Sequence, residues 1–532
     1  MWSKQIISIP FKISCIKMFN LAALLLLTLS ISSNNAAKIL AYFPIPSFSH
    51  QVVFRVLTQE LAKRGHEVTV ITTDPAFPSG GTPANLTEID VHDLSYENWK
   101  ALREVGSKGE KDSIFQMRLA SEIVLKVIEM QLNVDKVKKI LKEEKFDLLL
   151  LEACVRSALM LSHVFKAPVI LMSSLGPFTF NVETIGAAWH PLLYPSPLTR
   201  RVHNLTKWEK LIELWNFYRM ETSLVGYKDE ENRIAKRLLG PGVPPISELN
   251  NNVAMMFLNI HPIWEGNRPV PPSVVYIGGL HQRPVKKLPS ELQTYLDSSK
   301  FGIIYISFGT NVKTSLLPPE RVQLMVKVFS ELPYDVLWKW DKDQLPERSK
   351  NIRISKWLPQ SDLLRHPKIK LFITQGGLQS TDEAISAGVP LIGIPMMSDQ
   401  WYNVEKYVHF GIGVKLDLLA MSEEEFKNAI KTVIEDKSYR NNIVKLGSIM
   451  RDQPQPPLER AVWWTEHVLR HGGGKHMRSS SANMSWTEYL ELELVFTLLA
   501  IILGFFVILS FLLHCLWKHL KLRKEQYKLK TN

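Results

Sequence analysis

The chain has 532 residues, of which 45% are hydrophobic and 22% charged, and its formal net charge is +12. This composition is that of a globular protein and excludes a disordered polyelectrolyte. The charge lies mainly at the ends, because residues 1–17 carry three lysines without an acid and residues 518–532 carry six basic side chains and one acid. The 500 residues between them have a net charge of only +4, so we expect no nucleic-acid partner.

The N-terminal segment, residues 1–37, is predicted to be a secretory signal peptide. Its basic start is followed by an apolar run of 11 residues, Leu21–Ile31, and then by small and polar residues that end at Ala36 and Ala37. This order is typical of a leader that is removed by cleavage, and the apolar run is too short to cross a bilayer.

Two blocks of alternating strand-like and helix-like segments follow the leader. In the first block, residues 38–280, the apolar runs are 38–43, 67–72, 146–151 and 168–172. In the second block, residues 291–470, they are 302–307, 335–340, 369–374 and 390–396. Continuous apolar runs are typical of parallel strands that are buried on both faces. The sequence therefore predicts an α/β fold with two parallel-sheet domains, joined by a linker at residues 281–290.

A juxtamembrane segment (471–494), a transmembrane helix (495–517) and a basic tail (518–532) are predicted at the C-terminal end. Residues 495–517 contain no Asp, Glu, Lys or Arg, and at about 1.5 Å per residue they span about 34 Å, enough for the hydrocarbon layer of about 30 Å. The basic tail predicts a single-pass type I protein with residues 38–494 in the lumen. Lys528 and Lys530 match the dilysine pattern of the endoplasmic reticulum, although a simple membrane-surface charge run is the alternative.

Cysteine is too rare to support a disulfide framework. Cys15 falls in the leader and Cys515 in the predicted span, which leaves Cys154 alone in the predicted luminal part. There is no CxxC pair, so zinc ribbons and thioredoxin-type sites are excluded, and we expect no bound metal. Three N-x-[ST] sequons also lie on the predicted luminal side, and they predict a glycoprotein: Asn85, Asn204 and Asn483.

The most informative stretch is residues 357–403. It contains WLPQ at 357–360, FITQGGLQSTDEA at 372–384 and AGVPLIGIPMMSDQWYN at 387–403. The expected strand ending at Thr374 turns through Gly376 and Gly377 into a helix. Free N–H groups and the helix dipole at such a turn can hold a phosphate.

Four polar or aromatic side chains of this stretch suit a sugar nucleotide. Glu383, expected in the first turn of the helix, could accept hydrogen bonds from ribose hydroxyls, and Trp357 could stack on a base. Asp399 and Gln400 follow another predicted strand and could bond to sugar hydroxyls. Taken singly, each also has a plainer interpretation: a tight turn, a core tryptophan or a helix cap.

The whole stretch resembles the signature of the UDP-glycosyltransferase family, in particular its animal branch and the insect enzymes. The resemblance extends over nearly the whole chain, from the signal peptide to the basic tail. It implies a GT-B fold, in which two Rossmann-like parallel-sheet domains face each other across a cleft. The N-terminal domain would bind the acceptor and the C-terminal domain the UDP-sugar, which serves as co-substrate without a further cofactor.

By position, the resemblance assigns a donor site to the second domain: Ser307, Lys339, Trp357, Gln360, Gln375, Gly377, Gln379, Ser380, Glu383, Asp399 and Gln400. Trp357 would stack on uracil, Gln360 and Glu383 would contact the nucleoside, and Asp399 and Gln400 the sugar. The diphosphate would lie against the remaining residues of the turn and of the strand end: Ser307, Gly377, Gln379 and Ser380.

Two of these positions depart from the usual family pattern. The family usually has His at the position of Gln375, and a glutamine donates an N–H but cannot become cationic. We interpret Gln375 as a feature of the insect lineage. Lys339 stands where vertebrate relatives tend to carry Arg, so the charge is kept and the bidentate fork is lost.

A catalytic pair is implied in the first domain. His50 ends the loop 44–49 after the first strand, where a helix-capping or solvent-facing histidine is the simpler interpretation without the resemblance. By resemblance, His50 is the general base that deprotonates the acceptor, which attacks the anomeric carbon and inverts it. Glu152, at the end of the run 146–152, stands where the family usually has Asp and could orient the imidazole. Asp147 is expected at the opposite edge of the sheet.

The sequence therefore predicts an enzyme that transfers a hexose from a UDP-sugar to a hydroxyl of a small lipophilic acceptor, for detoxification or for hormone or pigment conjugation. The QGG turn favours glucose over glucuronate. A non-catalytic sugar-nucleotide-binding or carrier protein is the alternative, whereas a dehydrogenase is excluded because the loop 44–49 contains no glycine. A homo-oligomer is left open, and so is the role of the aromatic residues of 178–218 in the acceptor pocket, in packing or at the membrane.

Overall fold

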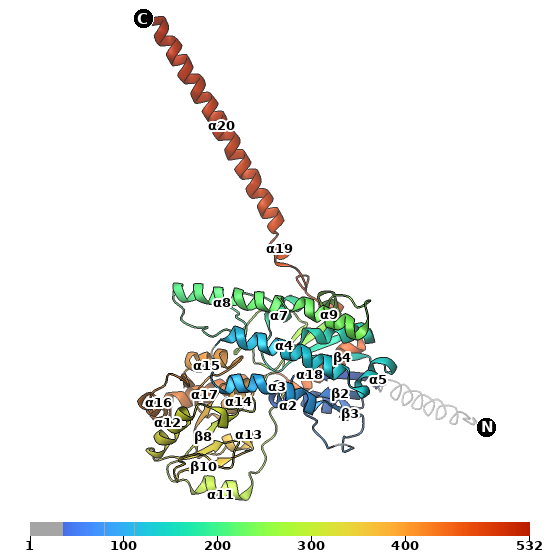
Figure 1. The fold of residues 1–532 in the computed structure, drawn as a ribbon, viewed down its shortest axis with the longest axis vertical. Coiled ribbons are helices and arrows are strands. Elements are labelled where there is room, and N and C mark those ends of the chain that lie inside the picture. The colour runs from blue at the N-terminus through green and yellow to red at the C-terminus, as the bar shows by residue number, and fades with distance from the viewer. Residues whose placement is uncertain (1–35, 79, 111, 532) are drawn as a thin grey trace, which may run out of the picture.

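The structure is a computed structural model that describes residues 36–78, 80–110 and 112–531. The predicted signal peptide lies outside this part of the chain, except for its last two residues. The described residues form two α/β units and one long C-terminal helix, which projects away from them (Figure 1).

The first unit is built on a seven-stranded sheet in the order β3-β2-β1-β4-β5-β6-β7, in which all pairs are parallel. Its strands are β1 Lys38–Phe43, β2 Glu67–Thr72, β3 Leu86–Asp90, β4 Leu148–Glu152, β5 Val169–Ser173, β6 Val253–Leu258 and β7 Val274–Tyr276. Its helices are α2 Phe48–Lys63, α3 His92–Ser107, α4 Ser113–Leu132, α5 Asp135–Glu143, α6 Met160–Phe165, α7 Thr179–Ile185, α8 Lys207–Val225, α9 Lys228–Leu239 and α10 Ile246–Leu249. The central strands are buried throughout, as expected for a sheet covered by helices on both faces.

The second unit is a six-stranded parallel sheet in the order β10-β9-β8-β11-β12-β13. Its strands are β8 Ile303–Ser307, β9 Asp335–Lys339, β10 Ile352–Ser355, β11 Ile369–Thr374, β12 Leu391–Gly393 and β13 Gly413–Lys415. Its helices are α11 Ser290–Ser298, α12 Pro319–Ser330, α13 Gln360–Leu364, α14 Leu378–Ala387, α15 Gln400–His409, α16 Glu423–Glu435 and α17 Lys437–Arg451. The predicted two-sheet α/β architecture is confirmed.

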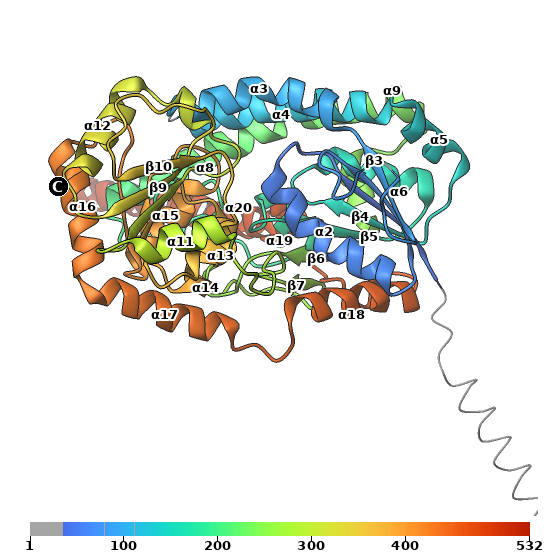
Figure 2. The same cartoon turned by 90° about the horizontal axis from the view of Figure 1, so that it is seen from below.

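The helix α18, Pro457–Arg470, follows the second unit in the sequence but packs on the first. After α17 the chain returns to the first unit, and α18 lies beside α2 along the lower edge of Figure 2. Its buried residues Ala461, Val462 and Val468 belong to the same hydrophobic cluster as residues of β1 and α2. The range 291–470, which the sequence groups with the second domain, therefore includes a helix that packs on the first sheet.

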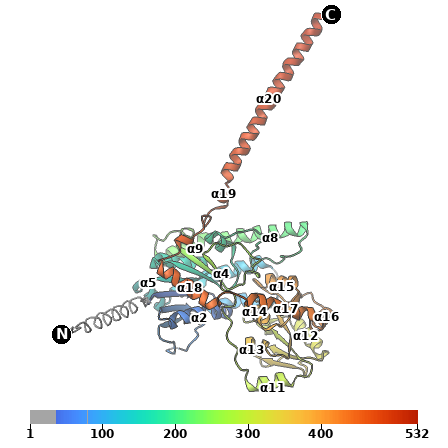
Figure 3. The same ribbon diagram turned by 180° about the vertical axis from the view of Figure 1, so that it is seen from behind.

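The C-terminal helix α20, Leu492–Thr531, extends beyond the predicted span 495–517 and includes the basic tail up to Thr531. Within the described residues it is the one helix that is long and apolar enough to cross a membrane. It follows the short helix α19, Trp486–Tyr489, and projects from the body in both Figures 1 and 3. The segment before it is tied to the first unit, because Asn483 N–H donates to Glu183 O at 2.9 Å and the Ser481 hydroxyl to Gly186 O at 3.1 Å.

Candidate active site

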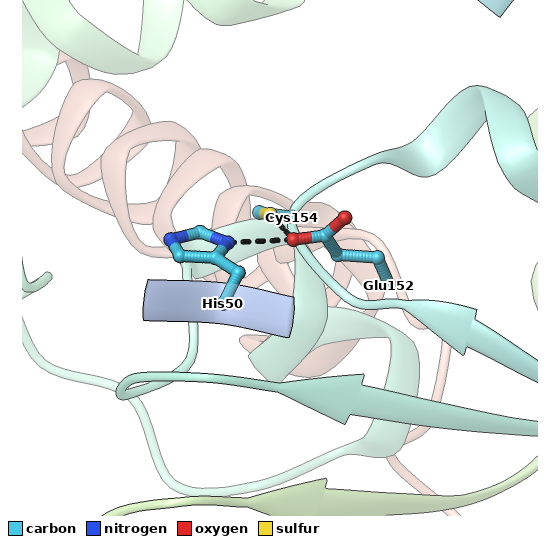
Figure 4. Close-up of side chains that lie close together, drawn as sticks. All are labelled: His50, Glu152 and Cys154. Atoms are coloured by element: carbon cyan, nitrogen blue, oxygen red, sulfur yellow. Dashed lines mark hydrogen bonds and ion pairs between the residues drawn. The ribbon is translucent and has the colours of Figure 1, made fainter. Parts of the chain in front are cut away.

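His50 and Glu152 meet at the carboxyl edge of the first sheet. The strands β1 and β4 are neighbours, so the loop after β1 and the last residue of β4 lie at the same edge. The Nδ1 atom of His50 is 2.6 Å from Oε1 of Glu152 (Figure 4). The helix α2 begins at Phe48, so His50 lies in its first turn rather than in the preceding loop as predicted. Asp147 lies at the opposite edge, as predicted, where it accepts a hydrogen bond from Lys38 N–H at 2.8 Å.

Glu152 is fully buried, and each of its oxygens has a donor. Ile45 N–H donates to Oε2 at 3.1 Å, while Oε1 faces the imidazole. An ionised carboxylate only accepts hydrogen bonds, so in a contact with ionised Glu152 the Nδ1 atom of His50 is the donor. The Nε2 atom, which points away from Glu152 in Figure 4, then carries the lone pair that a general base needs.

Cys154 is the third polar side chain of this cluster. Its Sγ lies 3.6 Å from Oε1 of Glu152, and burial raises the pKa of the thiol well above its usual value, with a further contribution from the Glu152 charge. The donor atoms of His50, Glu152 and Cys154 lie within 4.8 Å of one another, so this group could hold a metal ion. Metal binding requires the thiolate, which the raised pKa disfavours, so the contacts fit a hydrogen-bonded pair better.

The pair adjoins a cavity of about 700 Å³ that both units line. Loops that follow β1, β4 and β5 contribute one wall, and loops that follow β8, β11 and β12 contribute the other. His50 and ten of the eleven residues of the predicted donor site line this cavity. The exceptions among the predicted site residues are Glu152, which lies behind His50, and Ser307, which is buried below the loop after β8 and accepts a hydrogen bond from Gly309 N–H at 3.4 Å.

Gln360 organises the part of the cavity that was predicted to hold the nucleoside. Its Nε2 donates to Ser380 Oγ at 2.9 Å and to Glu383 Oε2 at 2.7 Å, and its Oε1 accepts from the Tyr305 hydroxyl at 2.9 Å. Burial raises the pKa of Glu383. The helix α14 begins at Leu378, so Glu383 lies in its second turn and not in the first as predicted. This network fixes the positions of these hydrogen-bonding side chains before a ligand binds.

Trp357 and Lys339 lie next to each other on the same wall. The Trp357 side chain is 59% exposed, which leaves its ring accessible for stacking. The ammonium of Lys339 lies 4.9 Å from the centre of that ring and donates to Gly309 O at 2.9 Å. Burial lowers the pKa of Lys339 to about 8. The lysine is therefore a cation whose charge an anionic ligand would stabilise.

Glycine is required where the loops after β8 and β11 approach each other. Gly309 has a φ of +73°, and a methyl group at its Cα would overlap Nε2 of Gln375. The Gln375 side chain is oriented by the Thr374 hydroxyl, which donates to its Oε1 at 2.9 Å. Its Nε2 also lies close to Gly377, the residue that precedes α14. The residues at the start of α14 line the same cavity as the Gln375 side chain, and free N–H groups at a helix start can hold a phosphate.

The three remaining residues of the predicted donor site each form hydrogen bonds within the protein. Gln379 lines the cavity, but its Nε2 donates to Ser174 O of the first unit at 2.8 Å. Asp399 accepts from Asn403 Nδ2 at 2.7 Å, and burial raises its pKa. Gln400 accepts two hydrogen bonds of 2.9 Å from the N–H groups of residues 396 and 397. Gln379 therefore joins the two units as well as lining the site.

Sequence comparison places this geometry in a family. Residues 37–526 match the sequence model of the family described as UDP-glucoronosyl and UDP-glucosyl transferase. The chain is a member of the UDP-glycosyltransferase family. It is 36% identical to the ecdysteroid UDP-glucosyltransferase of Spodoptera littoralis nuclear polyhedrosis virus, over 90% of this chain and 96% of the viral one. It is 29% identical to the human UDP-glucuronosyltransferase 2B7, over 96% of this chain and 99% of the human one.

A solved structure supports the fold of this UDP-glycosyltransferase. The crystal structure of UDP-glucose:anthocyanidin 3-O-glucosyltransferase in complex with UDP aligns with a TM-score of 0.55 at 16% identity, covering 81% of this chain and 99% of the other. The predicted GT-B fold is confirmed. The family and the fold together make the protein a glycosyltransferase that uses a UDP-sugar donor.

Several residues that line the cavity of this UDP-glycosyltransferase were not predicted from the sequence. The main group follows β8 and comprises Gly309, Thr310 and Asn311, with Tyr305 on the strand itself. In the run Ser307–Thr310 a glycine lies two residues after the end of a buried strand, as Gly376 does after β11, so the signal is the same one that identified the turn at Gly377. Phe48 could not have been found in this way, because its ring meets Trp357 edge-on at 5.5 Å only after the two units come together.

Proposed function

We propose that this UDP-glycosyltransferase is an inverting enzyme that moves glucose from UDP-glucose to a hydroxyl group of a small lipophilic acceptor. The observation that carries the proposal is the contact between His50 and buried Glu152, at the edge of a cavity that also contains the donor residues. A base of this kind suits a single displacement, in which the acceptor attacks from the side opposite the leaving group.

In the proposed reaction, Nε2 of His50 takes the proton of the acceptor hydroxyl while its oxygen forms a bond to the anomeric carbon of glucose. The bond from that carbon to the β-phosphate oxygen breaks at the same time, and UDP leaves with the electron pair. Glu152 keeps the imidazole oriented and stabilises the imidazolium that forms. The nucleophile and the base are brought together by binding, which removes most of the entropic cost of the encounter.

The leaving diphosphate would be stabilised without a bound metal ion taking part. The N–H groups at the start of α14, after Gly377, provide donors aligned with the helix dipole. The Gln375 amide adds a neutral donor, and the Lys339 ammonium adds a charge. We propose that the lysine supplies the positive charge that the glutamine cannot provide.

Glucose is proposed as the sugar because the turn before α14 has the sequence Gln375-Gly376-Gly377, which by resemblance to the insect enzymes favours UDP-glucose. Asp399 lines the same cavity and could accept hydrogen bonds from hydroxyl groups of either sugar, so it does not decide between them. The name of the viral relative as a UDP-glucosyltransferase is in line with this choice, while the human relative is named for glucuronate.

The acceptor is proposed to be lipophilic because the half of the cavity within the first unit is lined mainly by apolar side chains. These include Trp99, Leu125, Leu175, Phe178, Phe180 and Leu224. Such a surface favours steroid-like or aromatic compounds, for which burial of apolar area supplies the binding free energy. The ecdysteroid named for the viral relative belongs to this chemical class.

We also propose that α20 crosses the membrane of the endoplasmic reticulum, with both catalytic units in the lumen and the basic tail in the cytosol. The apolar length of α20, the charge of the tail and the dilysine pattern support this placement. We expect residues 38–494 to be protected from protease in sealed microsomes. We also expect glycosylation at Asn85 that a glycosidase removes. Digestion of the catalytic units in sealed microsomes would contradict the placement.

The full-length protein, purified in detergent, should be given either UDP-glucose or UDP-glucuronate with a panel of phenols and sterols. We expect glucosides of several acceptors and little or no glucuronide, measured by mass spectrometry of the products. Formation of glucuronides alone would overturn the choice of donor. Binding of UDP-sugar without turnover of any acceptor would instead favour a carrier protein.

A further inference from the structure

The helix α8, Lys207–Val225, exposes an unusual series of aromatic and aliphatic side chains. Trp208, Trp215 and Tyr218 are 71%, 60% and 59% exposed, and Leu211 and Ile212 between them are exposed as well. Their spacing of three, four and seven residues places them on one face of the helix. We call this set of five residues the aromatic stripe.

The opposite face of α8 is more polar than the stripe. Glu213 is buried there, and burial raises the pKa of its carboxyl group, partly offset by the charges of Arg200 and Arg201. Met220, also on this side, is buried, and α8 rests on α4. A helix that faces water normally turns its acids outward and its tryptophans inward. The aromatic stripe has the opposite arrangement, and exposed apolar patches of this kind mark surfaces that contact a membrane or another molecule.

The position of the helix indicates what covers it. In Figures 1 and 3, α8 lies on the side of the first unit from which α20 departs, and it runs across the direction of α20. The segment before α20 is held to α7 and to the residue after it by the hydrogen bonds from Asn483 and Ser481. A bilayer crossed by α20 would therefore face the side of the protein that carries the aromatic stripe.

We infer that α8 lies in the interfacial layer of the membrane that α20 crosses, with the aromatic stripe among the lipid headgroups and the upper acyl chains. Tryptophan and tyrosine favour this layer because their rings are apolar and their N–H and O–H groups reach water or headgroups. The exposed bases Lys207 and Arg219 lie beside the stripe, four residues from Leu211 and Trp215, and can extend to lipid phosphates. The inference rests on the proposed role of α20 as the span.

The contact would bring the acceptor half of the cavity close to the lipid. Leu224, near the end of α8, lines the cavity, and so does Tyr227 just after the helix. A helix that touches lipid with its outer face thus forms a wall of the acceptor site with its inner face. Lipophilic acceptors concentrate in the bilayer, so this arrangement would supply them from the membrane rather than from water.

The test uses a photoreactive benzoyl-phenylalanine in the full-length protein, inserted at Trp215 and reconstituted as single copies in nanodiscs of phosphatidylcholine and phosphatidylserine. The matched control carries it at Phe301, which is 53% exposed and follows α11 at the far end of the molecule from α20 (Figure 1). We expect lipid adducts from position 215 and none from position 301, measured by mass spectrometry. Equal labelling at both positions, or no lipid adduct at position 215, would overturn the inference.

Two controls distinguish the lipid contact of α8 from a protein interface and from a failure of α20 to span the membrane. In vesicles with many copies, a crosslink from position 215 to a second copy of the chain, in place of lipid, would show that the aromatic stripe is a protein interface and would overturn the inference. Resistance of the protein to carbonate extraction tests α20 separately, so failure of the span and failure of the stripe give different results.

A second measurement does not depend on the photoreactive group. A variant with Trp208→Gln, Leu211→Gln and Trp215→Gln changes exposed side chains only, so its unfolding temperature in detergent should match that of the wild type. In nanodiscs, amide exchange in α8 should be faster in the variant than in the wild type, while exchange in α17 remains the same. Equal exchange of α8 in the two proteins would contradict the lipid contact.

Discussion

Replacement of Glu152 by Gln tests the proposed dyad most sharply within the protein, because it removes a charge and keeps the shape of the side chain. Glu152 is fully buried, and its Oε1 lies 2.6 Å from Nδ1 of His50. A glutamine can accept a hydrogen bond through its amide oxygen, but it cannot stabilise the imidazolium that forms when His50 takes a proton. If the glutamine instead donates its amide N–H to Nδ1, the imidazole carries its proton on Nε2, and Nε2 can no longer act as the base.

The size of the effect follows from the role of the base. General-base catalysis contributes about 10²- to 10⁴-fold to a rate, which corresponds to about 3 to 5 kcal/mol of activation free energy. We expect the Glu152→Gln substitution to reduce kcat by a factor within that range, measured by steady-state formation of glucoside. The KM for UDP-glucose and the Kd for UDP should stay close to wild type, because Glu152 lies behind His50 and does not line the cavity.

Glu152→Asp is the matched control, because it keeps the carboxylate and shortens the side chain by one carbon–carbon bond of about 1.5 Å. Its loss of kcat should be smaller than that of Glu152→Gln. A kcat of Glu152→Gln within about threefold of wild type, below the smallest effect expected for loss of a general base, would refute the dyad. Equal losses in both variants would show that packing at this position matters and the charge does not.

Three further predictions concern the donor half of the cavity. Trp357→Ala should raise the KM for UDP-glucose by about 2- to 13-fold, because a stacked aromatic contact contributes about 0.5 to 1.5 kcal/mol, and an unchanged KM would exclude stacking. Gly309→Ala should weaken UDP binding in calorimetry, because the added methyl group overlaps the Gln375 amide at a φ of +73°, whereas wild-type affinity would show that this approach is not needed. The pKa of Lys339 is lowered to about 8, so its charge is lost and the affinity of the free enzyme for UDP should fall as the pH rises above that value. Lys339→Arg stays charged, so an identical pH dependence in that variant would exclude the lysine as the cause.

Much of the sheet architecture could be predicted from the sequence, because buried parallel strands are nearly continuous apolar runs. The strands β1, β2 and β11 have the predicted bounds. The edge strand β3, Leu86–Asp90, was missed because only its first residue is buried and its sequence is largely polar. The strand β6 is fully buried and has a clear apolar pattern, so it could have been recognised as well.

The local position of the site residues could also be predicted, because strand ends define it, but their contacts could not. The distance between His50 and Glu152 depends on β1 and β4 being neighbours, although 102 residues separate the two side chains in the sequence. The bond from Gln379 to Ser174 depends on how the two units meet. The aromatic stripe points outward because the other face of α8 meets α4. The hydrophobic pattern alone predicts the reverse, with the apolar face packed against the protein.

The anomeric configuration of the product tests the central claim most directly. UDP-glucose carries its sugar in the α configuration, and a single displacement with His50 as the base must give a β-glucoside. The purified protein should be incubated with UDP-glucose and a phenolic or steroidal acceptor, and the isolated glucoside examined by proton NMR of the anomeric position. We predict the β-glucoside from the wild type and no detectable product from His50→Ala. An α-glucoside, or a β-glucoside formed at the wild-type rate by His50→Ala, would contradict the account.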